Sequence, residues 1–288
     1  MTGTGLSLLI VAATAFSTLA IFMKVAFMAG VNLTTLLAFR FLFSAGFCFA
    51  ALGLIGKKIV LPKAQWGPVF LLGGVVHVAV SIFYAISVQR LPAALTGLVF
   101  YLYPAMVTVM AIVLGRESLN RFRLAALAVC FVGLLQVMGV SLGVVSLSGM
   151  LFGIAAAFMQ ACHVLLSHSI VNDVSPLLAV GWSALATSAV FFVYGGMDGS
   201  LQWNLTMPAW GAILGTGFFA NFIGIVCFFA GMKLVGPSTA SIVMNLEQVL
   251  TVVLSVLLLA ESFSWGQAIG GGGILLGLYL LQRKESSR

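Results

Sequence analysis

The chain has 288 residues, of which 62% are hydrophobic and only 7% are charged. A typical soluble domain carries about 25% charged residues. These numbers argue against water-soluble enzymes, scaffolds and nucleic-acid-binding domains. The net charge of +7 does not indicate a nucleic-acid partner, because the basic residues form no dense patch with interleaved aromatic side chains.

Ten apolar segments follow one another along the chain, each near the roughly 20 residues that a membrane-spanning helix needs. The sequence lacks the short alternating segments of a membrane β-barrel, so we predict an all-α integral membrane bundle of ten transmembrane helices. The first segment is interpreted as a retained span, since it is longer than the apolar core of a secretory signal and no basic region precedes it. The predicted spans cover residues 5–28, 34–56, 66–88, 93–115, 121–140, 148–170, 176–194, 209–231, 238–260 and 265–282.

Lysine and arginine are unevenly divided between the loops on the two sides of the predicted bundle. Ten of them lie at the chain ends and in the even-numbered loops, whereas the odd-numbered loops hold only Arg90. Basic loops stay on the cytoplasmic side of a membrane. We therefore expect both termini in the cytoplasm.

The two halves of the sequence share residue pairs at one fixed separation. Two pairs recur 144 residues later, Trp66–Gly67 as Trp210–Gly211 and Glu117–Ser118 as Glu261–Ser262. We predict two repeats, residues 1–144 and 145–288, with five spans each. Because five is odd, the second repeat must enter the membrane upside down. Inverted repeats around a site near the membrane midplane are a recurring plan of secondary transporters.

The predicted architecture and several short stretches resemble the EamA-like branch of the drug/metabolite transporter superfamily. The stretches are Ala38–Arg40, Arg90–Ala94, Tyr101–Pro104 and the Glu-Ser pairs after spans four and nine. Within that branch the sequence is most similar to bacterial exporters of aromatic and other neutral amino acids. The resemblance implies a multi-pass protein of the bacterial inner (plasma) membrane. It also implies a central cavity surrounded by the first four helices of each repeat, with the fifth and tenth helices at the periphery.

Polar residues inside a membrane bundle are costly and are therefore candidates for function. In span three, His77, Ser81 and Tyr84 share one helical face. Equivalent positions of the two repeats hold His77 and Asn221, and likewise Tyr101 and Asn245. For each candidate the alternative is a polar group that is satisfied locally within the bundle. The expected cavity residues are His77, Ser81, Tyr84, Tyr101, Gln160, His163, Asn221, Asn245 and Glu247.

Four further features concern bending and charge inside the spans. Pro104 lies near the middle of span four, where it removes a backbone hydrogen bond and is expected to act as a kink or hinge. An isolated carboxylate at Glu247 costs roughly 2.5–3.5 kcal/mol, so we expect it to be protonated, paired or in contact with water. It could bind a substrate ammonium, exchange a proton or hold a structural partner. Lys24 and Arg40 are interpreted as gate or structural charges, with Lys24 reaching the interface and Arg40 pairing with a carboxylate or holding a helix end.

The preferred function is an inner-membrane transporter that exports amino acids, aromatic ones included, and related small metabolites by alternating access. The alternative is an exporter of drugs, quaternary cations or other metabolites of the same superfamily. A channel is disfavoured because the sequence has no ring of like charges or filter segment, and an intramembrane enzyme because it has no HExxH or GxSxG motif. Downhill facilitation and proton-coupled antiport both remain open, with His77, His163 and Glu247 as the candidate proton carriers.

We expect no catalytic residues, no cofactor and no metal site. The four cysteines lie singly in apolar runs without metal-ligand spacing, and no ATP-binding motif occurs. The expected partners are a small-molecule substrate and the lipid bilayer, with no nucleic acid. A monomer is the expected form, and a dimer is the alternative.

Overall fold

The computed structural model describes residues 3–91, 93–118, 120–138, 146–259 and 264–285, and the regular elements in these ranges are all helices. Eight of the described segments are long and apolar enough to cross a membrane. Backbone N–H and C=O groups find no water in lipid, so apolar runs satisfy them within helices. The all-α membrane fold is confirmed for these residues. The helices of the fifth and tenth predicted spans are not among these eight candidates, so the count of ten transmembrane helices stays a prediction.

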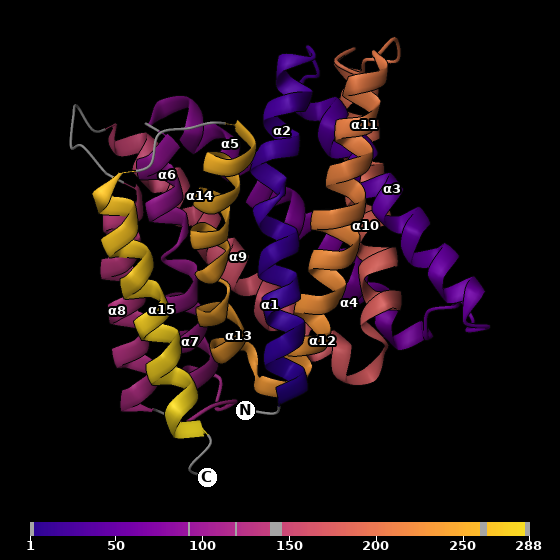
Figure 1. Ribbon diagram of the computed structural model, residues 1–288. Helices are drawn as coiled ribbons and strands as arrows, with labels where there is room; N and C mark the ends of the chain where they lie inside the picture. Colours follow the sequence, from indigo (N-terminus) through magenta and orange to yellow (C-terminus); the bar gives the residue numbers. More distant parts are fainter. Residues whose placement is uncertain (1–2, 92, 119, 139–145, 260–263, 286–288) are drawn as a thin grey trace.

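The chain folds into helices that run along a roughly common direction, and its two ends lie at the same end of the bundle (Figure 1). We call this the terminal end. The first half contains α1 (Gly3–Ser17), α2 (Leu19–Met28), α3 (Leu33–Leu54), η1 (Lys63–Gln65), α4 (Trp66–Phe70), η2 (Leu71–His77), α5 (Val78–Arg90), α6 (Ala93–Phe100), α7 (Tyr103–Val113) and α8 (Arg121–Met138). The second half contains α9 (Leu147–Asp173), α10 (Pro176–Met197), α11 (Met207–Gly215), η3 (Thr216–Gly224), α12 (Ile225–Val235), α13 (Pro237–Val243), α14 (Leu246–Leu259) and α15 (Trp265–Glu285).

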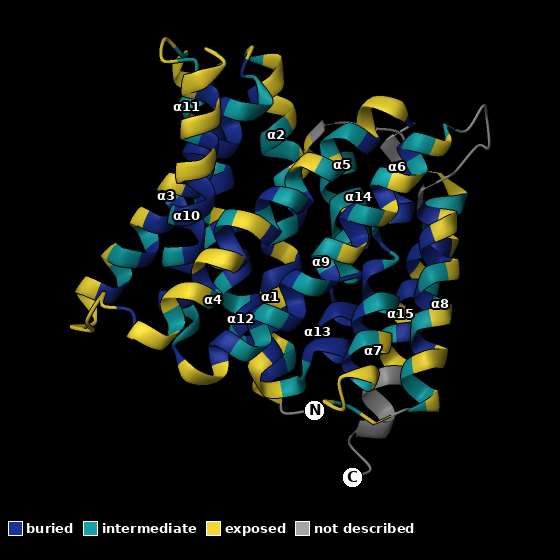
Figure 2. Ribbon diagram, turned by 180° about the vertical axis from the view of Figure 1, so that it is seen from behind, coloured by how far each residue is buried: buried dark blue, intermediate teal, exposed yellow. Residues whose placement is uncertain are grey.

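Large apolar side chains cover the outside of this bundle. Leu54, Val113 and Leu257 are 89%, 80% and 72% exposed, respectively. Exposed residues line the outward faces of the helices, and buried residues gather where helices face one another (Figure 2). A water-soluble protein rarely exposes so much contiguous apolar surface, so lipid is the natural surrounding of these faces.

The two halves pack mainly on each other. The most extensive contacts join α8 with α15, α3 with α10, α5 with α9, and α1 with α12. In the first two pairs, a helix of one repeat packs on its own equivalent in the other repeat. The other two pairs correspond to each other, because α5 is equivalent to α12 and α9 is equivalent to α1. This is the contact pattern that a pseudo-two-fold axis between the halves produces.

Equivalent helices run in opposite directions where they meet. Between α3 and α10, the Ser188 hydroxyl donates to the Ala38 carbonyl at 2.8 Å, while Gly181 packs against the ring of Phe49. Residue numbers thus rise along one helix as they fall along the other. This antiparallel arrangement is what inversion of the second half requires. The predicted boundary between residues 144 and 145 lies outside the described residues.

Glycines bring α8 and α15 into backbone contact. A Cβ atom at Gly277 would lie 2.5 Å from Cys130 Sγ and 2.9 Å from the Ala126 carbonyl oxygen. We therefore expect Gly277→Ala to destabilise the protein by about 1–3 kcal/mol, as overpacked contacts do. The measurement is the thermal unfolding midpoint in detergent. Gly272→Ala is the control, since a Cβ there meets nothing within 4 Å, and equal midpoints for both variants would contradict the prediction.

Spans one, three and eight are not the continuous α-helices that their apolar runs suggested. The first span is interrupted at Thr18, between α1 and α2. Spans three and eight contain wide π-helical turns at equivalent places, η2 and η3. A tertiary contact reaches η2, where the Thr187 hydroxyl donates to the Gly73 carbonyl at 2.8 Å. Such turns are frequent at functional sites, and here they carry His77 and Asn221.

Candidate substrate site

Spans four and nine are both interrupted near the middle of the bundle. A turn at Tyr101–Leu102 separates α6 from α7, and a turn at Met244–Asn245 separates α13 from α14. Pro104 lies in the first turn of α7, where its missing N–H is tolerated. Span nine has no proline at this place, but the Asn245 side chain donates to the Ile242 carbonyl at 2.8 Å. Discontinuous helices near the midplane are typical of transporter binding sites.

The first cluster of polar side chains surrounds these interruptions. The Gln248 amide donates to the Tyr101 hydroxyl, and this hydroxyl also lies near enough to the Glu247 carboxyl to interact with it. Tyr84 and Tyr103 lie near enough to Glu247 to interact with its charge. We call these five residues the tyrosine–glutamate cluster. Glu247 is in the first turn of α14, where the helix dipole favours a carboxylate.

The second cluster lies around an arginine in α3. The rings of His77 and His163 are 4.8 Å apart in an edge-to-face arrangement, and His77 lies near enough to Arg40 to interact with its charge. Asn221 belongs to η3, which packs along α3. Arg40, His163 and Asn221 are 8%, 5% and 3% exposed. We call these four residues together with Ser44 the arginine–histidine cluster.

The predicted cavity residues thus divide between two clusters, with three of them outside both. Ser81 donates its hydroxyl to the carbonyl of His77 at 3.0 Å, so its polar group is satisfied within its own helix. Asn245 is likewise engaged with its own turn. Gln160 is partly exposed on α9, and Lys24 is exposed on α2. The predicted role of each as a cavity residue, hinge or gate charge stays a prediction.

Three members of these clusters, Gln248, Tyr103 and Ser44, are not among the site residues that the sequence predicts. Gln248 contacts Tyr101 directly, whereas the repeat positions pair Tyr101 with Asn245. Ser44 is fully buried one turn after Arg40 in α3. The available signal for Gln248 was its equivalence to Pro104, 144 residues earlier. Nothing in the sequence distinguishes Ser44 from other small polar residues in spans.

The glutamate of the first Glu-Ser pair joins the two halves at the terminal end. The Glu117 carboxylate accepts hydrogen bonds from Arg123 Nη1 at 2.7 Å and from the backbone N–H of Ser238 at 3.3 Å. Gly236 has φ of +85°, and a Cβ there would lie 2.9 Å from Glu117 Oε1. Glu117 therefore holds the start of α13 against the first half. The equivalent Glu261 lies outside the described residues.

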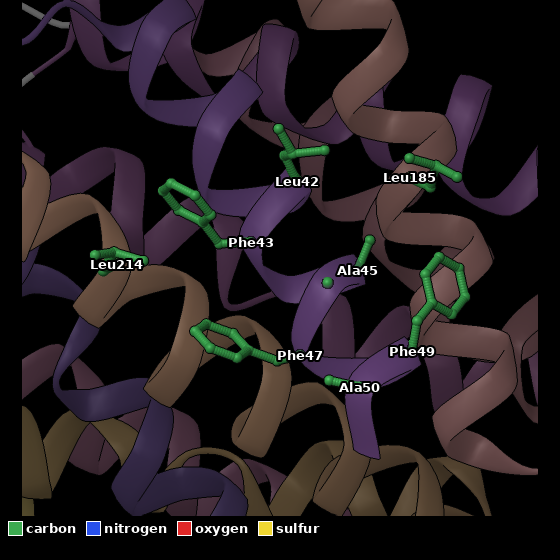
Figure 3. A pocket seen from close by; sticks show the side chains of 9 residues that line it. Leu42, Phe43, Ala45, Phe47, Phe49, Ala50, Leu185 and Leu214 are labelled. Carbon is green, nitrogen blue, oxygen red and sulfur yellow. The ribbon is translucent and has the colours of Figure 1, made fainter. Parts of the chain in front are cut away.

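An open apolar groove lies elsewhere, on the outer side of α3 (Figure 3). It is lined by side chains of α3, α10 and α11, among them Phe43, Phe47, Leu185 and Leu214. Its lining offers almost no polar surface. The groove is therefore suited to lipid chains rather than to a polar solute, and the two clusters are the candidate substrate site.

The chain has helices long enough to span a membrane, arranged in two halves that pack on each other. Polar side chains gather where these helices are interrupted, and this combination defines a membrane transporter. The model of the EamA-like transporter family matches residues 3–139 and 147–283. The chain therefore belongs to the EamA-like transporter family of the drug/metabolite transporter superfamily, which confirms the resemblance seen in the sequence. The two matches begin 144 residues apart.

Individual relatives are distant in sequence. An uncharacterized transporter of Archaeoglobus fulgidus is 22% identical over 241 residues, which cover 82% of this chain and 84% of the relative. A protein of known crystal structure has a TM-score of 0.87 and 21% identity, with 98% of each chain covered. At this level of identity the structural likeness concerns the fold alone.

Proposed function

We propose that this transporter exports amino acids, aromatic ones included, and related small metabolites by alternating access. The observation that carries the proposal is the tyrosine–glutamate cluster, in which Glu247 lies beside the Tyr101 hydroxyl inside the bundle. A carboxylate bordered by aromatic rings suits an ammonium group through charge and cation–π attraction. A carboxylate within a membrane bundle is also costly unless it has a function or a partner.

Alternating access is supported by an unequal exposure of equivalent helices. Residues 246–252 of α14 are all partly exposed. Of the equivalent residues in span four, Tyr103, Pro104, Val107 and Thr108 are buried. Since α14 lies farther from the terminal end than α7 (Figure 1), we infer that the end away from the termini is the more open one. In the opposite state of the transport cycle α7 would be the exposed helix and α14 the buried one, with the interruptions of spans four and nine as the points of bending.

The proposed location is the bacterial inner membrane, with both termini in the cytoplasm. Its support is the concentration of Lys and Arg in the loops of the terminal side. The more open end would then face outward. The proposal includes transport of solutes from the cytoplasm to the outside.

Export of drugs or quaternary cations is the second candidate function. The same observation favours it, because a carboxylate with neighbouring tyrosines also suits a quaternary ammonium ion. The two candidates differ in what they require of the rest of the substrate. An amino acid brings a carboxylate that needs its own binding groups, and a lipophilic cation does not.

The test is uptake into liposomes that contain only this purified protein. Labelled amino acids and one lipophilic cation are offered with and without an imposed pH gradient, and empty liposomes are the control. We expect saturable, stereoselective amino-acid flux that unlabelled aromatic amino acids inhibit. Flux of the cation without amino-acid flux would instead support the drug-exporter function.

Energy coupling can be decided with a variant that removes the candidate proton carriers. If transport is coupled to protons, wild-type uptake will increase in a pH gradient, and the increase will be lost in the triple variant His77→Gln, His163→Gln, Glu247→Gln. The measurement compares initial uptake rates with and without the gradient. A triple variant that still responds to the gradient would show that these groups do not carry the proton.

A further inference from the structure

The Arg40 guanidinium is buried without a carboxylate partner among the described residues. Its Nη1 lies 4.0 Å from the Met23 sulfur, its Cζ lies 4.7 Å above the Phe41 ring, and its Nε has no hydrogen-bond partner. The sequence predicts a carboxylate or a helix end at this place. Neither accounts for the guanidinium, because the contacts that the structure gives it are a thioether and a ring.

The carboxylates inside or beside the described bundle are engaged elsewhere. Glu247 belongs to the tyrosine–glutamate cluster, and Glu117 is paired with Arg123. Asp173 accepts a hydrogen bond from Gln65, and Asp198 accepts one from the backbone N–H of Ser200. The charge of Arg40 is thus not neutralised from within the described part of the chain.

Three more buried polar atoms near Arg40 lack hydrogen-bond partners. They are Ser44 Oγ, His163 Nδ1 and Asn221 Nδ2. Ser44 follows Arg40 by one turn. Asn221 follows Gly217 by one turn, and Gly217 packs on the Arg40 carbonyl, with a Cβ there only 2.9 Å from it. His163 is linked to Arg40 through the ring of His77.

All four unpartnered groups can act as hydrogen-bond donors. Buried polar groups in proteins are almost always hydrogen-bonded, and the exceptions call for a ligand or another cause. A buried cation without a partner is costlier still. Four unpartnered donors on the neighbouring elements α3, α9 and η3, one of them cationic, are complementary to an anion. The planar fork of arginine matches the two oxygens of a carboxylate in particular.

We propose that the arginine–histidine cluster binds the carboxylate of the transported solute. This inference rests on the proposed function and narrows it, because the substrates become molecules that carry both an amine and a carboxylate. His77 joins the carboxylate site, and Tyr84, two turns further along the same span, joins the Glu247 site. Seven residues of helix span about 10 Å, which is farther than the amine and carboxylate of one α-amino acid can reach. The solute therefore occupies the two sites in succession along this face of span three, and a simple cation leaves Arg40 unpaired.

The test measures binding of three probes to the purified full-length protein in detergent by calorimetry. The probes are L-phenylalanine, N-acetyl-L-phenylalanine, which keeps only the carboxylate, and L-phenylalaninamide, which keeps only the amine. Loss of a hydrogen-bonded charge pair weakens binding at least about ten-fold. We therefore expect the wild type to bind phenylalanine at least ten-fold more tightly than its amide. Arg40→Gln should bind N-acetyl-L-phenylalanine at least ten-fold more weakly and should lose the difference between acid and amide.

Arg90→Gln is the matched control, since Arg90 is exposed at the end of α5 and its loss should change neither ratio. The comparison of acid and amide in the wild type needs no variant, so it decides the matter even if Arg40→Gln fails to fold. Equal binding of acid and amide, no binding of either carboxylate probe, or an Arg40→Gln protein that keeps the ratio would each overturn the inference. If the liposomes show amino-acid flux but the protein binds L-phenylalanine and its amide equally well, the proposed function holds and the carboxylate site is wrong. If binding of N-acetyl-L-phenylalanine depends on Arg40 but the liposomes show no amino-acid flux, the carboxylate site holds and the proposed function is wrong.

Discussion

Glu247→Gln is expected to raise the KM for an amine-bearing substrate by about 10- to 100-fold, the cost of losing one charge-assisted hydrogen bond. Glutamine has nearly the same shape as glutamate and can still reach the Tyr101 hydroxyl, which lies beside Glu247 at the start of α14. The bundle should therefore fold normally. The measurement is the concentration dependence of uptake into liposomes, with the protein content of the vesicles determined independently.

A matched variant separates loss of a binding charge from loss of charge in general. Asp173→Asn removes a carboxylate at the exposed end of α9 and should leave the KM unchanged. Substrates without an amine should be affected equally little by Glu247→Gln and by Asp173→Asn. An unchanged KM for amine-bearing substrates in Glu247→Gln would show that the carboxylate is structural rather than a binding group.

Apolar length and repeat spacing were enough to predict the fold class. Each predicted span corresponds to one described helix or helix series, because satisfaction of the backbone in lipid leaves helices as the available solution for an apolar run. The 144-residue offset also relates features that the sequence does not reveal by itself. The turn after Phe100 and the turn at Met244–Asn245 lie at equivalent positions, although only the first is followed by a proline.

The features that the sequence does not predict depend on contacts between distant segments of the chain. The wide turn η2 receives a hydrogen bond at the Gly73 carbonyl from Thr187, which lies in α10. Gln248 reaches Tyr101 only because spans four and nine are interrupted at the same level. A buried charge such as Arg40 is expected to find a carboxylate, but the contacts of its guanidinium in the folded chain are the Met23 thioether and the Phe41 ring, and its Nε has no hydrogen-bond partner. No local pattern in the sequence carries that information.

Gly73→Ala is expected to destabilise the protein more than any other single methyl addition considered above. A Cβ at Gly73 would lie 2.0 Å from the Ser183 carbonyl oxygen, and the next nearest atoms also belong to the backbone. Spans three and seven would have to separate, which costs about 3 kcal/mol or more. At roughly 2–4 °C per kcal/mol for a protein of this size, the thermal midpoint in detergent should fall by about 6–12 °C.

The neighbouring glycine supplies the control for this prediction. A Cβ at Gly74 would make only ordinary contacts at 4.0 Å with Ala186 and Val190. Gly74→Ala therefore makes the same change in helix propensity as Gly73→Ala but without the clash. The repeat equivalent Gly217→Ala, with a 2.9 Å approach to the Arg40 carbonyl, should fall between the two. That order would mean that the repeats meet through paired backbone contacts beside the two wide turns, next to His77 and Asn221. Equal midpoints for Gly73→Ala and Gly74→Ala would mean instead that span three can move away from span seven at little cost.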